Sequence, residues 1–416
     1  MERRRFLSSS LLGTAAVALP FDARSFGQSS EAGIQSETAG QPLPCLTRAE
    51  VLQAMNASGH LKPARCFVVA YNFPSWHPTP VQEKWFGRGW TEFQLLSNAR
   101  TLFGGHQMPR RPLWGYYNEA DPAWAEKEID LASSHGVDAW MIDWYWHNGT
   151  QFYHEQLEQG FQKASNCSKL KFAVMWANHH WKNFYPARSP DDAAVLLTQE
   201  HSHEDCVRVI EYCIRKYFHH DSYWRIHDSP VFAIFDLNLF VEKLTFDGAR
   251  RALDAMRERV RKAGFVDLHI QASHSYSSLI PQLPDLGVQS ATQYHSFAWT
   301  YGGRSPGGHS PFKDGALTTI HSWQETGRQM TVPFFPDCPV GWDDSPRFGT
   351  SSHIVVGRSP DQYELLLRAA RHYAASLSAP AVFLSAWNEW TEDHVLLPDQ
   401  IYGYSYLDAV RRVFRE

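Results

Sequence analysis

Eight short runs of apolar residues constrain the fold of this 416-residue chain more than any other feature of its sequence. Each run is continuously apolar instead of alternating, a pattern typical of a parallel strand that is buried on both faces. The runs cover residues 66–73, 138–146, 171–178, 230–236, 268–273, 289–295, 332–337 and 381–390. We therefore expect a fold built on eight buried parallel strands.

Helical patterns separate most of these strands. They cover residues 122–134, 152–164, 190–218, 247–264, 316–329, 361–377 and 404–414. Strand followed by helix, repeated, predicts a parallel sheet, which is either a closed barrel or a doubly wound open sheet. Polar residues follow the ends of most runs, and barrel enzymes carry their catalytic groups at the carboxyl ends of the strands. The sequence therefore favours an α/β protein of the TIM-type (β/α)8 barrel class.

Two segments precede the expected domain. Residues 1–28 carry Arg3, Arg4 and Arg5 ahead of an apolar run at 11–20, and they resemble a twin-arginine export signal. That run has roughly half of the ~20 residues that a membrane-spanning helix needs. We therefore expect an exported protein, periplasmic or extracellular, with no membrane span once the signal is removed. Residues 29–60, rich in Ser, Gly, Gln and Glu, predict a flexible leader, and residues 61–416 a single domain.

Charge and cysteine usage exclude several classes of protein. A formal net charge of −5 argues against a nucleic-acid partner. Of the six cysteines, Cys206 and Cys213 are expected two turns apart on one helix, too far apart for a disulfide. Cys66 and Cys338 are interpreted as small buried apolar residues. A single disulfide among the six cysteines is left as an alternative. The sequence has no nucleophile elbow, phosphate-binding loop or dinucleotide motif, and we expect no cofactor. The oligomeric state is not predicted.

The pair Glu389 and Glu392 is the strongest local pattern. Hydrolysis of a glycosidic bond needs one carboxylic acid and one carboxylate. Two Glu residues three positions apart, where the eighth strand opens into a loop, can point into one cavity. Trp387 and Trp390 would lower the dielectric constant around the pair and raise one pKa. The alternative is a surface Glu pair at the end of a strand.

Aromatic residues are unusually frequent: the chain has 16 Trp, 17 Tyr and 25 Phe. Flat rings backed by polar groups suit the faces and hydroxyls of sugars, although a Trp-rich core is the alternative. We expect an oligo- or polysaccharide substrate. Strand ends and two long loops, 74–121 and 338–360, supply the candidate contacts. These are Tyr71, Trp85, Glu92, Asp143, Trp144, Tyr145, Trp176, Asn178, His179, His180, Asp236, Tyr294, His295, Trp342, Asp343, Trp387, Asn388 and Trp390.

Several of these candidates have a structural alternative. Asp143 and Asp236 could instead cap the helices that follow them. The histidine pairs, His179–His180 and His219–His220, lack the spacing and the partner cysteines of a typical zinc site. We therefore expect no catalytic metal, and we place His179 and His180 in contact with substrate.

From Phe67 to Phe414 the chain resembles the WbsX-like proteins, which are similar to glycoside hydrolase family 99. The resemblance is carried by segments that match in order and spacing. They are WFGRGWTEF (85–93), GHQMPR (105–110), GYY (115–117), YWHNG (145–149), WAN (176–178), GWDDSPR (341–347) and WNEWTE (387–392), followed by PD (398–399) and YGY (402–404). The resemblance implies a (β/α)8 barrel that acts on glycans.

The same resemblance implies roles for the two glutamates. Glu389 would deprotonate the 2-hydroxyl of the sugar, giving a 1,2-anhydro sugar, and Glu392 would act as general acid and base. Because the internal nucleophile must lie trans to the leaving group, this route favours α-mannosides or α-rhamnosides and retains the anomeric configuration.

Some positions depart from the family pattern. His179 and His180 stand where relatives tend to have Glu and Asn, Asp143 and Trp144 where they often have Tyr and His, Asp393 where Gly is common, and Asp236 where Arg is. The sugar pocket is therefore expected to differ from that of the relatives. A glycosyltransferase of surface-polysaccharide synthesis and a non-catalytic carbohydrate-binding protein are the alternative functions.

Overall fold

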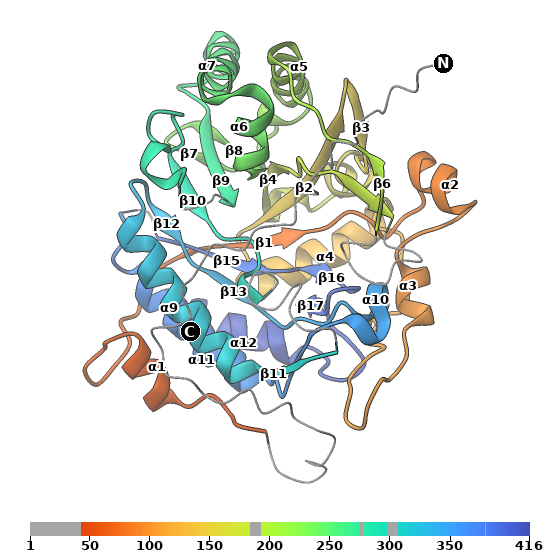
Figure 1. Ribbon diagram of the computed structural model, residues 1–416, viewed down its shortest axis with the longest axis vertical. Coiled ribbons are helices and arrows are strands. Elements are labelled where there is room, and N and C mark those ends of the chain that lie inside the picture. Colours follow the sequence, from red (N-terminus) through yellow and green to blue (C-terminus); the bar gives the residue numbers. More distant parts are fainter. Residues whose placement is uncertain (1–42, 184–192, 275–277, 298–306, 379) are drawn as a thin grey trace, which may run out of the picture.

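A computed structural model describes residues 43–183, 193–274, 278–297, 307–378 and 380–416 of the chain. Parallel strands form a barrel with helices outside it (Figure 1). In hydrogen-bonded order the strands are β12 (Phe334–Phe335), β10 (Ser290–Thr292), β9 (His269–His274), β8 (Ser229–Asp236), β4 (Lys171–Trp176), β2 (Ala139–His147), β1 (Phe67–Asn72), β15 (Ala381–Ser385) and β13 (Asp337–Pro339). Each lies within or beside one of the eight predicted runs.

The barrel closes through a single bent strand. β12 pairs with β10 on one side, and β13 pairs with β15 on the other. Only Pro336 separates β12 from β13, and proline has no N–H for the ladder. Its carbonyl still accepts a hydrogen bond from the Phe383 N–H at 2.9 Å. Counted as one strand, β12 and β13 bring the total to eight, which confirms the predicted barrel and excludes the open sheet.

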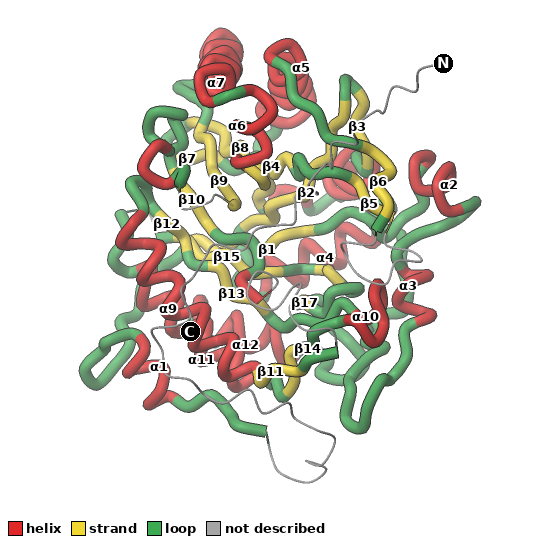
Figure 2. Tube along the Cα trace, in the orientation of Figure 1, coloured by secondary structure: helices red, strands yellow, loops and turns green. Residues whose placement is uncertain are grey.

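An outer layer of helices covers the barrel (Figure 2). Its members are α4 (Pro122–Ser134), α5 (His203–Cys213), α6 (Leu237–Leu244), α7 (Phe246–Lys262), α9 (Phe312–Gln329), α11 (Pro360–Ala374) and α12 (Ser405–Phe414). Side chains capping the N-termini fix several starts: Asp121 for α4, Ser202 for α5 and Ser359 for α11. Among the described residues, no helix is long and apolar enough to cross a membrane.

Two helix predictions are wrong in part. Residues 152–164 were expected to form one helix. Instead Phe152 ends the short strand β3 (Thr150–Phe152), and two short helical turns follow: a π turn, η2 (Gln156–Gly160), and a 3-10 turn, η3 (Phe161–Lys163). Within the range 190–218, residues 190–192 lie outside the described residues, and β6 (Ala194–Leu197) pairs with β5 (Trp181–Asn183). The pairing with β5 makes residues 194–197 a strand and not the start of a helix. The helix α5 begins only after its N-cap, Ser202.

The leader prediction is also wrong in part. Residues 1–42 lie outside the described residues, but α1 (Arg48–Ala54) is a regular helix within the range expected to be flexible. A capping box stabilises its start, since Thr47 and Glu50 each accept a hydrogen bond from the other's backbone N–H. The helix packs against α9 and α11 with Val51 and Ala54 buried. Local capping and burial therefore order a segment whose composition suggests a linker.

The two long loops fold into short elements that meet. Loop 74–121 contains α2 (Pro80–Phe86) and α3 (Phe93–Asn98), and loop 338–360 contains α10 (Ser345–Phe348) and β14 (Ile354–Val356), which pairs with β11 (His309–Pro311). α10 contacts α3, so loops that are far apart in the sequence close over the same end of the barrel (Figure 1). All six cysteines are free.

Candidate active site

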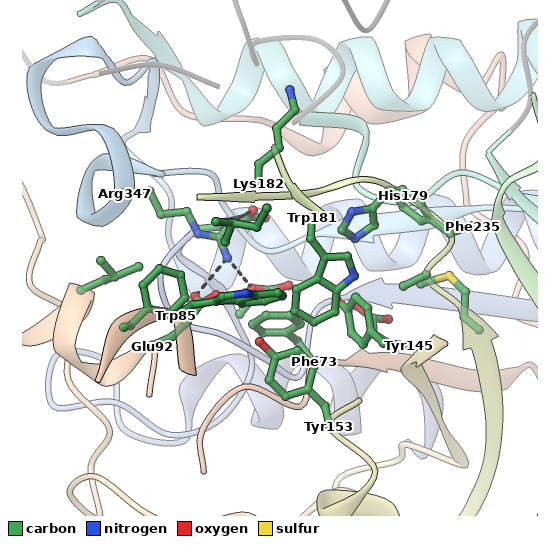
Figure 3. A pocket seen from close by; sticks show the side chains of 18 of the residues that line it. Phe73, Trp85, Glu92, Tyr145, Tyr153, His179, Trp181, Lys182, Phe235 and Arg347 are labelled. Carbon is green, nitrogen blue, oxygen red and sulfur yellow. Dashed lines mark hydrogen bonds and ion pairs between the residues drawn. The ribbon is translucent and has the colours of Figure 1, made fainter. Parts of the chain in front are cut away.

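A cavity of about 200 Å³ opens at the carboxyl ends of the strands (Figure 3). Its walls come from the ends of β1, β2, β4, β8, β10 and β15, from the loop bearing α2 and α3, from the β5–β6 pair and from α10. The lining residues are Phe73, Trp85, Phe86, Trp90, Glu92, Leu95, Asp143, Tyr145, Tyr153, Met175, Ala177, His179, Trp181, Lys182, Leu196, Phe235, Tyr294, Arg347, Glu389 and Glu392. Both glutamates singled out in the sequence therefore face one cavity.

Three carboxylates surround the buried guanidinium of Arg347. Its Nη2 lies 3.1 Å from Glu92 Oε2 and 3.6 Å from Glu389 Oε2, and its Nη1 contacts Glu392 Oε1. Thr391 donates from its hydroxyl to Glu92 Oε2 at 2.5 Å. The side chains of Arg347 and Glu389 are only 8% and 5% exposed, so these charges interact in a medium of low dielectric.

The two central glutamates differ in proton affinity. Burial, reinforced by the charge of Glu392, raises the pKa of Glu389 well above its usual range. Burial alone would also raise the pKa of Glu392, but the Arg347 guanidinium and the His394 ring together hold it below the usual value. Glu389 therefore holds a proton more readily than Glu392 does.

A histidine pair lies behind Glu392. His394 Nε2 is 2.7 Å from Glu392 Oε2, and the centroids of the His394 and His295 rings are 3.9 Å apart. Burial lowers the pKa of both rings, so both are neutral near pH 7. Ligand atoms of Glu389, Glu392 and His394 lie within 4.8 Å of one another, a spacing that would suit a metal ion. The Arg347 guanidinium already supplies positive charge to both carboxylates there.

Two further polar groups face the carboxylates. Asp143, at the end of β2, is buried, and its Oδ1 has no hydrogen-bond partner in the structure. Burial and then the charge of Glu392 raise the pKa of Asp143 well above its usual range, which favours its protonated form. Tyr294 donates from its hydroxyl to Glu389 Oε1 at 3.4 Å. A protonated carboxyl can both donate to and accept from a sugar hydroxyl.

Aromatic rings form the opposite wall of the cavity. Tyr153 stacks on Trp181 with centroids 5.2 Å apart and an angle of 17°. Trp85 and Tyr145 contact the same indole at 5.3 and 5.0 Å (Figure 3). Together these rings and the acidic groups give the cavity one apolar side and one charged side, an arrangement that suits a pyranose.

Of the predicted substrate contacts, six line the cavity beside the glutamate pair: Trp85, Glu92, Asp143, Tyr145, His179 and Tyr294. The others lie outside its lining: Tyr71, Trp144, Trp176, Asn178, His180, Asp236, His295, Trp342, Asp343, Trp387, Asn388 and Trp390. Each of these has a structural contact that accounts for its position.

Strand alternation places two tryptophans on the outer face of the barrel. Trp144 donates from its indole nitrogen to the Tyr217 hydroxyl at 3.2 Å, on the side of α5. Trp176 packs against His201 and Phe240, also in the helical layer. Because successive side chains of a strand point to opposite faces, Trp144 lies outside whereas its neighbours Asp143 and Tyr145 point inward.

Other predicted contacts hold backbone in place. Asp236 caps α6, accepting from the N–H groups of Asn238 and Leu239, so the structural alternative is the correct one for this residue. Asn178 exchanges two hydrogen bonds with the backbone of Asp236. His180 accepts from the Gln199 N–H at 2.9 Å.

The segment after β15 is anchored in the same way. Asn388 bonds both the N–H and the carbonyl of Phe73, at 2.8 and 2.9 Å, and so ties the end of β1 to the glutamate pair. Trp387 packs on Trp140, and Trp390 donates to the Tyr117 hydroxyl.

The remaining candidates support the cavity from behind. Tyr71 contacts Tyr294 edge-on, and His295 and Trp342 pack around the His394 ring. Asp343 contacts His106 Nε2 at 2.6 Å and accepts from the Ser345 N–H. These residues position the lining groups and do not themselves line the cavity.

Sequence reasoning missed several lining residues. Arg347 is the most consequential, and it ends the GWDDSPR segment that carries the family resemblance. Phe86 and Trp90 belong to WFGRGWTEF, whereas Trp181 and Lys182 lie a few residues after the WAN segment, outside any matching segment. Nothing in the spacing of these residues showed which of them face inward.

Comparison with known proteins agrees with the fold. The sequence model of the family described as Glycosyltransferase WbsX matches residues 68–410. Two curated relatives, each called Uncharacterized protein WxcX and found in two strains of Xanthomonas campestris pv. campestris, are 29% and 28% identical over 360 residues. The match covers 83% of this chain, and the chain spans about half the length of these relatives (49%).

Solved structures are similar in fold. The GH99 endo-alpha-mannosidase from Bacteroides thetaiotaomicron has a TM-score of 0.52 and 16% identity, over 83% of this chain and 95% of that chain. A structure described as a glycoside hydrolase-like protein has a TM-score of 0.57 and 13% identity, over 91% and 98% of the two chains. At these identities the likeness establishes the barrel fold alone.

Proposed function

The chain belongs to the family described as Glycosyltransferase WbsX, and from the geometry of its cavity we propose that it is a glycoside hydrolase that cleaves an α-linked glycan. One observation carries the proposal: Glu389 and Glu392 line one cavity, in surroundings that raise the pKa of the first and lower the pKa of the second. Glycoside hydrolysis requires such a pair, one group to protonate the leaving oxygen and one to activate a nucleophile.

The order of the two roles depends on Arg347. By resemblance, Glu389 takes the proton of the 2-hydroxyl and Glu392 protonates the leaving oxygen, whereas the surroundings here raise the pKa of Glu389 and lower that of Glu392. Arg347 Nη2 already lies 3.6 Å from Glu389 Oε2. A small shift of the guanidinium from Glu392 toward Glu389 on substrate binding would ionise Glu389 and allow Glu392 to hold the proton. Arg347 is thus the group that exchanges the roles.

The substrate is a manno-configured glycan, mannose or rhamnose, cleaved with retention through its 2-hydroxyl. The resemblance to family 99 supports this configuration. The mixed cavity supports a single sugar ring between the Trp181 wall and the carboxylates. The twin-arginine-like segment supports action outside the cytoplasm, where polysaccharides of this kind are accessible.

The test is hydrolysis of a panel of α-mannans and rhamnose-containing polysaccharides, followed by the release of reducing ends. Glu389→Gln and Glu392→Gln should each lower the rate by about 10²–10⁴. Glu128→Gln is the matched control, because Glu128 is equally buried but lies on α4 outside the cavity lining. Equal cleavage by wild type and both active-site variants would reject the assignment.

Stereochemistry tests the route. On an aryl α-mannoside or α-rhamnoside, NMR of the first-formed product should show the α anomer, and the matching 2-deoxy glycoside should remain uncleaved because it lacks the internal nucleophile. Cleavage of the 2-deoxy compound at the normal rate would reject participation of the 2-hydroxyl.

A glycosyltransferase is the second candidate, favoured by the description of the family. In that case an activated sugar donor with an oligosaccharide acceptor should give longer products, and water alone should release no sugar from the polymers. Mass spectrometry of the reaction products distinguishes the two functions.

A further inference from the structure

Exposed aromatic rings lie on the segment between α3 and α4 and at the start of α12. Among the described residues, the exposed aromatic side chains are Trp114, Tyr116 and Tyr404, which are 37%, 45% and 39% accessible. The Trp114 indole nitrogen donates to the Tyr404 hydroxyl at 3.2 Å, and Tyr116 stacks on Phe93 with centroids 4.5 Å apart. We call Phe93, Trp114, Tyr116 and Tyr404 the aromatic platform.

The platform rests on a rigid base. The segment bearing Trp114 pairs with the segment before Tyr404: Leu113 N donates to the Pro398 carbonyl at 2.8 Å, and Gln400 N donates to the Arg111 carbonyl at 3.0 Å. Beneath them, Arg110 and Asp399, each only 1% exposed, form an ion pair at 2.7 Å. Rings held in this way lose little conformational entropy when a ligand binds.

A groove of about 330 Å³ lies beside α3, and two residues of the platform, Phe93 and Tyr116, line it. Thr91, Phe93, Gln94, Ser97, Tyr116 and Tyr117 line it, so aromatic faces alternate with hydroxyl and amide groups. This mixture matches the alternating C–H faces and hydroxyls of a pyranose. A protein partner would instead require a broader apolar surface, on the order of 800 Å² per side.

The groove and the catalytic cavity share one helix. Glu92, which precedes α3, and Leu95 within it line the cavity, whereas Phe93, Gln94 and Ser97 of the same helix line the groove. The cavity and the groove therefore lie against the same helix.

We propose that the aromatic platform binds pyranose units of a polysaccharide outside the catalytic cavity, a site separate from the one that holds the scissile sugar. The identity of the polymer rests on the proposed function, but binding to the platform does not require hydrolysis. Its effect would be to hold the polymer near the cavity, raising the local concentration of cleavable bonds.

The test measures polymer affinity apart from chemistry. Retardation of the full chain in native gels containing an α-mannan or a rhamnan gives the affinity, and turnover of a short aryl glycoside gives the activity of the cavity. The double variant Trp114→Ala/Tyr116→Ala should bind the polymer about tenfold more weakly, a loss of about 1.4 kcal/mol, because it removes two rings whose faces sugars would contact. Its turnover of the short glycoside should stay unchanged. Val266→Ala, at a 67% exposed apolar residue elsewhere, is the control.

The outcomes separate the two proposals. Unchanged polymer affinity in the double variant overturns the platform, as does a wild-type chain that binds none of the polymers. A change in sedimentation without a change in polymer affinity also overturns it and indicates a protein interface. Weaker polymer binding combined with undiminished hydrolysis by Glu389→Gln and Glu392→Gln supports the platform while rejecting the proposed hydrolytic residues. Thermal unfolding of the double variant confirms that it is folded.

Discussion

Replacing Arg347 with methionine should destabilise the protein by an amount that depends on Glu392. The guanidinium is the shared partner of three buried carboxyl groups, and the substitution keeps much of its volume while removing its charge. A unit charge about 4 Å from a carboxylate contributes about 4 kcal/mol at an effective dielectric constant near 20. Breaking a buried pair by removing one partner costs about 3–5 kcal/mol. We therefore expect Arg347→Met to lower the free energy of unfolding by about 3–5 kcal/mol at pH 7.

The assay is urea unfolding of four proteins: wild type, Arg347→Met, Glu392→Gln and the double variant. In the double variant the amide replaces the ionised group that lost its partner. Its loss of stability should therefore be smaller than the sum of the single losses by roughly 2–3 kcal/mol. Changes that add to within about 0.5 kcal/mol would refute the idea that Arg347 and Glu392 form one electrostatic unit.

The pH dependence has a defined sign. In the wild type the folded pKa of Glu392 is lowered, so its stabilising contribution is present above the unfolded pKa and is lost as the pH falls toward the folded value. Without Arg347, burial raises the folded pKa of Glu392, and protonation then favours the folded state. The stability gap between wild type and Arg347→Met should narrow as the pH falls from 7 to 5. A gap that stays constant over this range would show that the loss is due to packing alone.

Three further results are expected. Asp236→Ala should cost about 1 kcal/mol by removing the cap of α6 and leave KM for any glycan unchanged; a raised KM in a stable variant would restore Asp236 as a substrate contact. Burial and the neighbouring Glu119 raise the pKa of Glu128 to about 8, so ionisation destabilises the wild type progressively from about pH 5 to 8. The advantage of Glu128→Gln in urea unfolding should grow across that range and then level off, and a flat difference would contradict the raised pKa. Trp181→Ala should raise KM about tenfold by removing the ring on which Tyr153 stacks, and steady-state kinetics with unchanged KM would exclude the stacking wall.

The barrel could be predicted from the sequence because its determinants are local. Each apolar run indicates a strand that is buried on both faces. Capping residues such as Asp121 and Ser359 show where helices begin. Closure could not be predicted in the same way. The bend at Pro336 divides the seventh strand between two neighbours, and that pairing depends on contacts with Phe383 and Ala291, which are distant in the sequence.

The site was predictable only in part, because the tertiary fold determines which side chains point into the cavity. Glu389 and Glu392 could be placed because they end a strand at the catalytic end of a barrel. Along β2, a strict period of two separates Asp143 and Tyr145 from Trp144, but a strand buried on both faces carries large aromatic residues on each, so its sequence does not show that period. Arg347 lies in a loop, where no periodicity indicates direction, and only the folded chain brings it to the carboxylates.

The bonds between Asn388 and Phe73 join residues that are 315 positions apart. Closing so long a loop is entropically costly and slow relative to local contacts, so this connection belongs to the last stages of folding. Until the segment after β15 docks, the aromatic wall and Arg347 lack the glutamate pair that faces them in the folded protein. A chain that lacks this segment would thus carry most of the barrel and most of the cavity lining without Glu389 and Glu392.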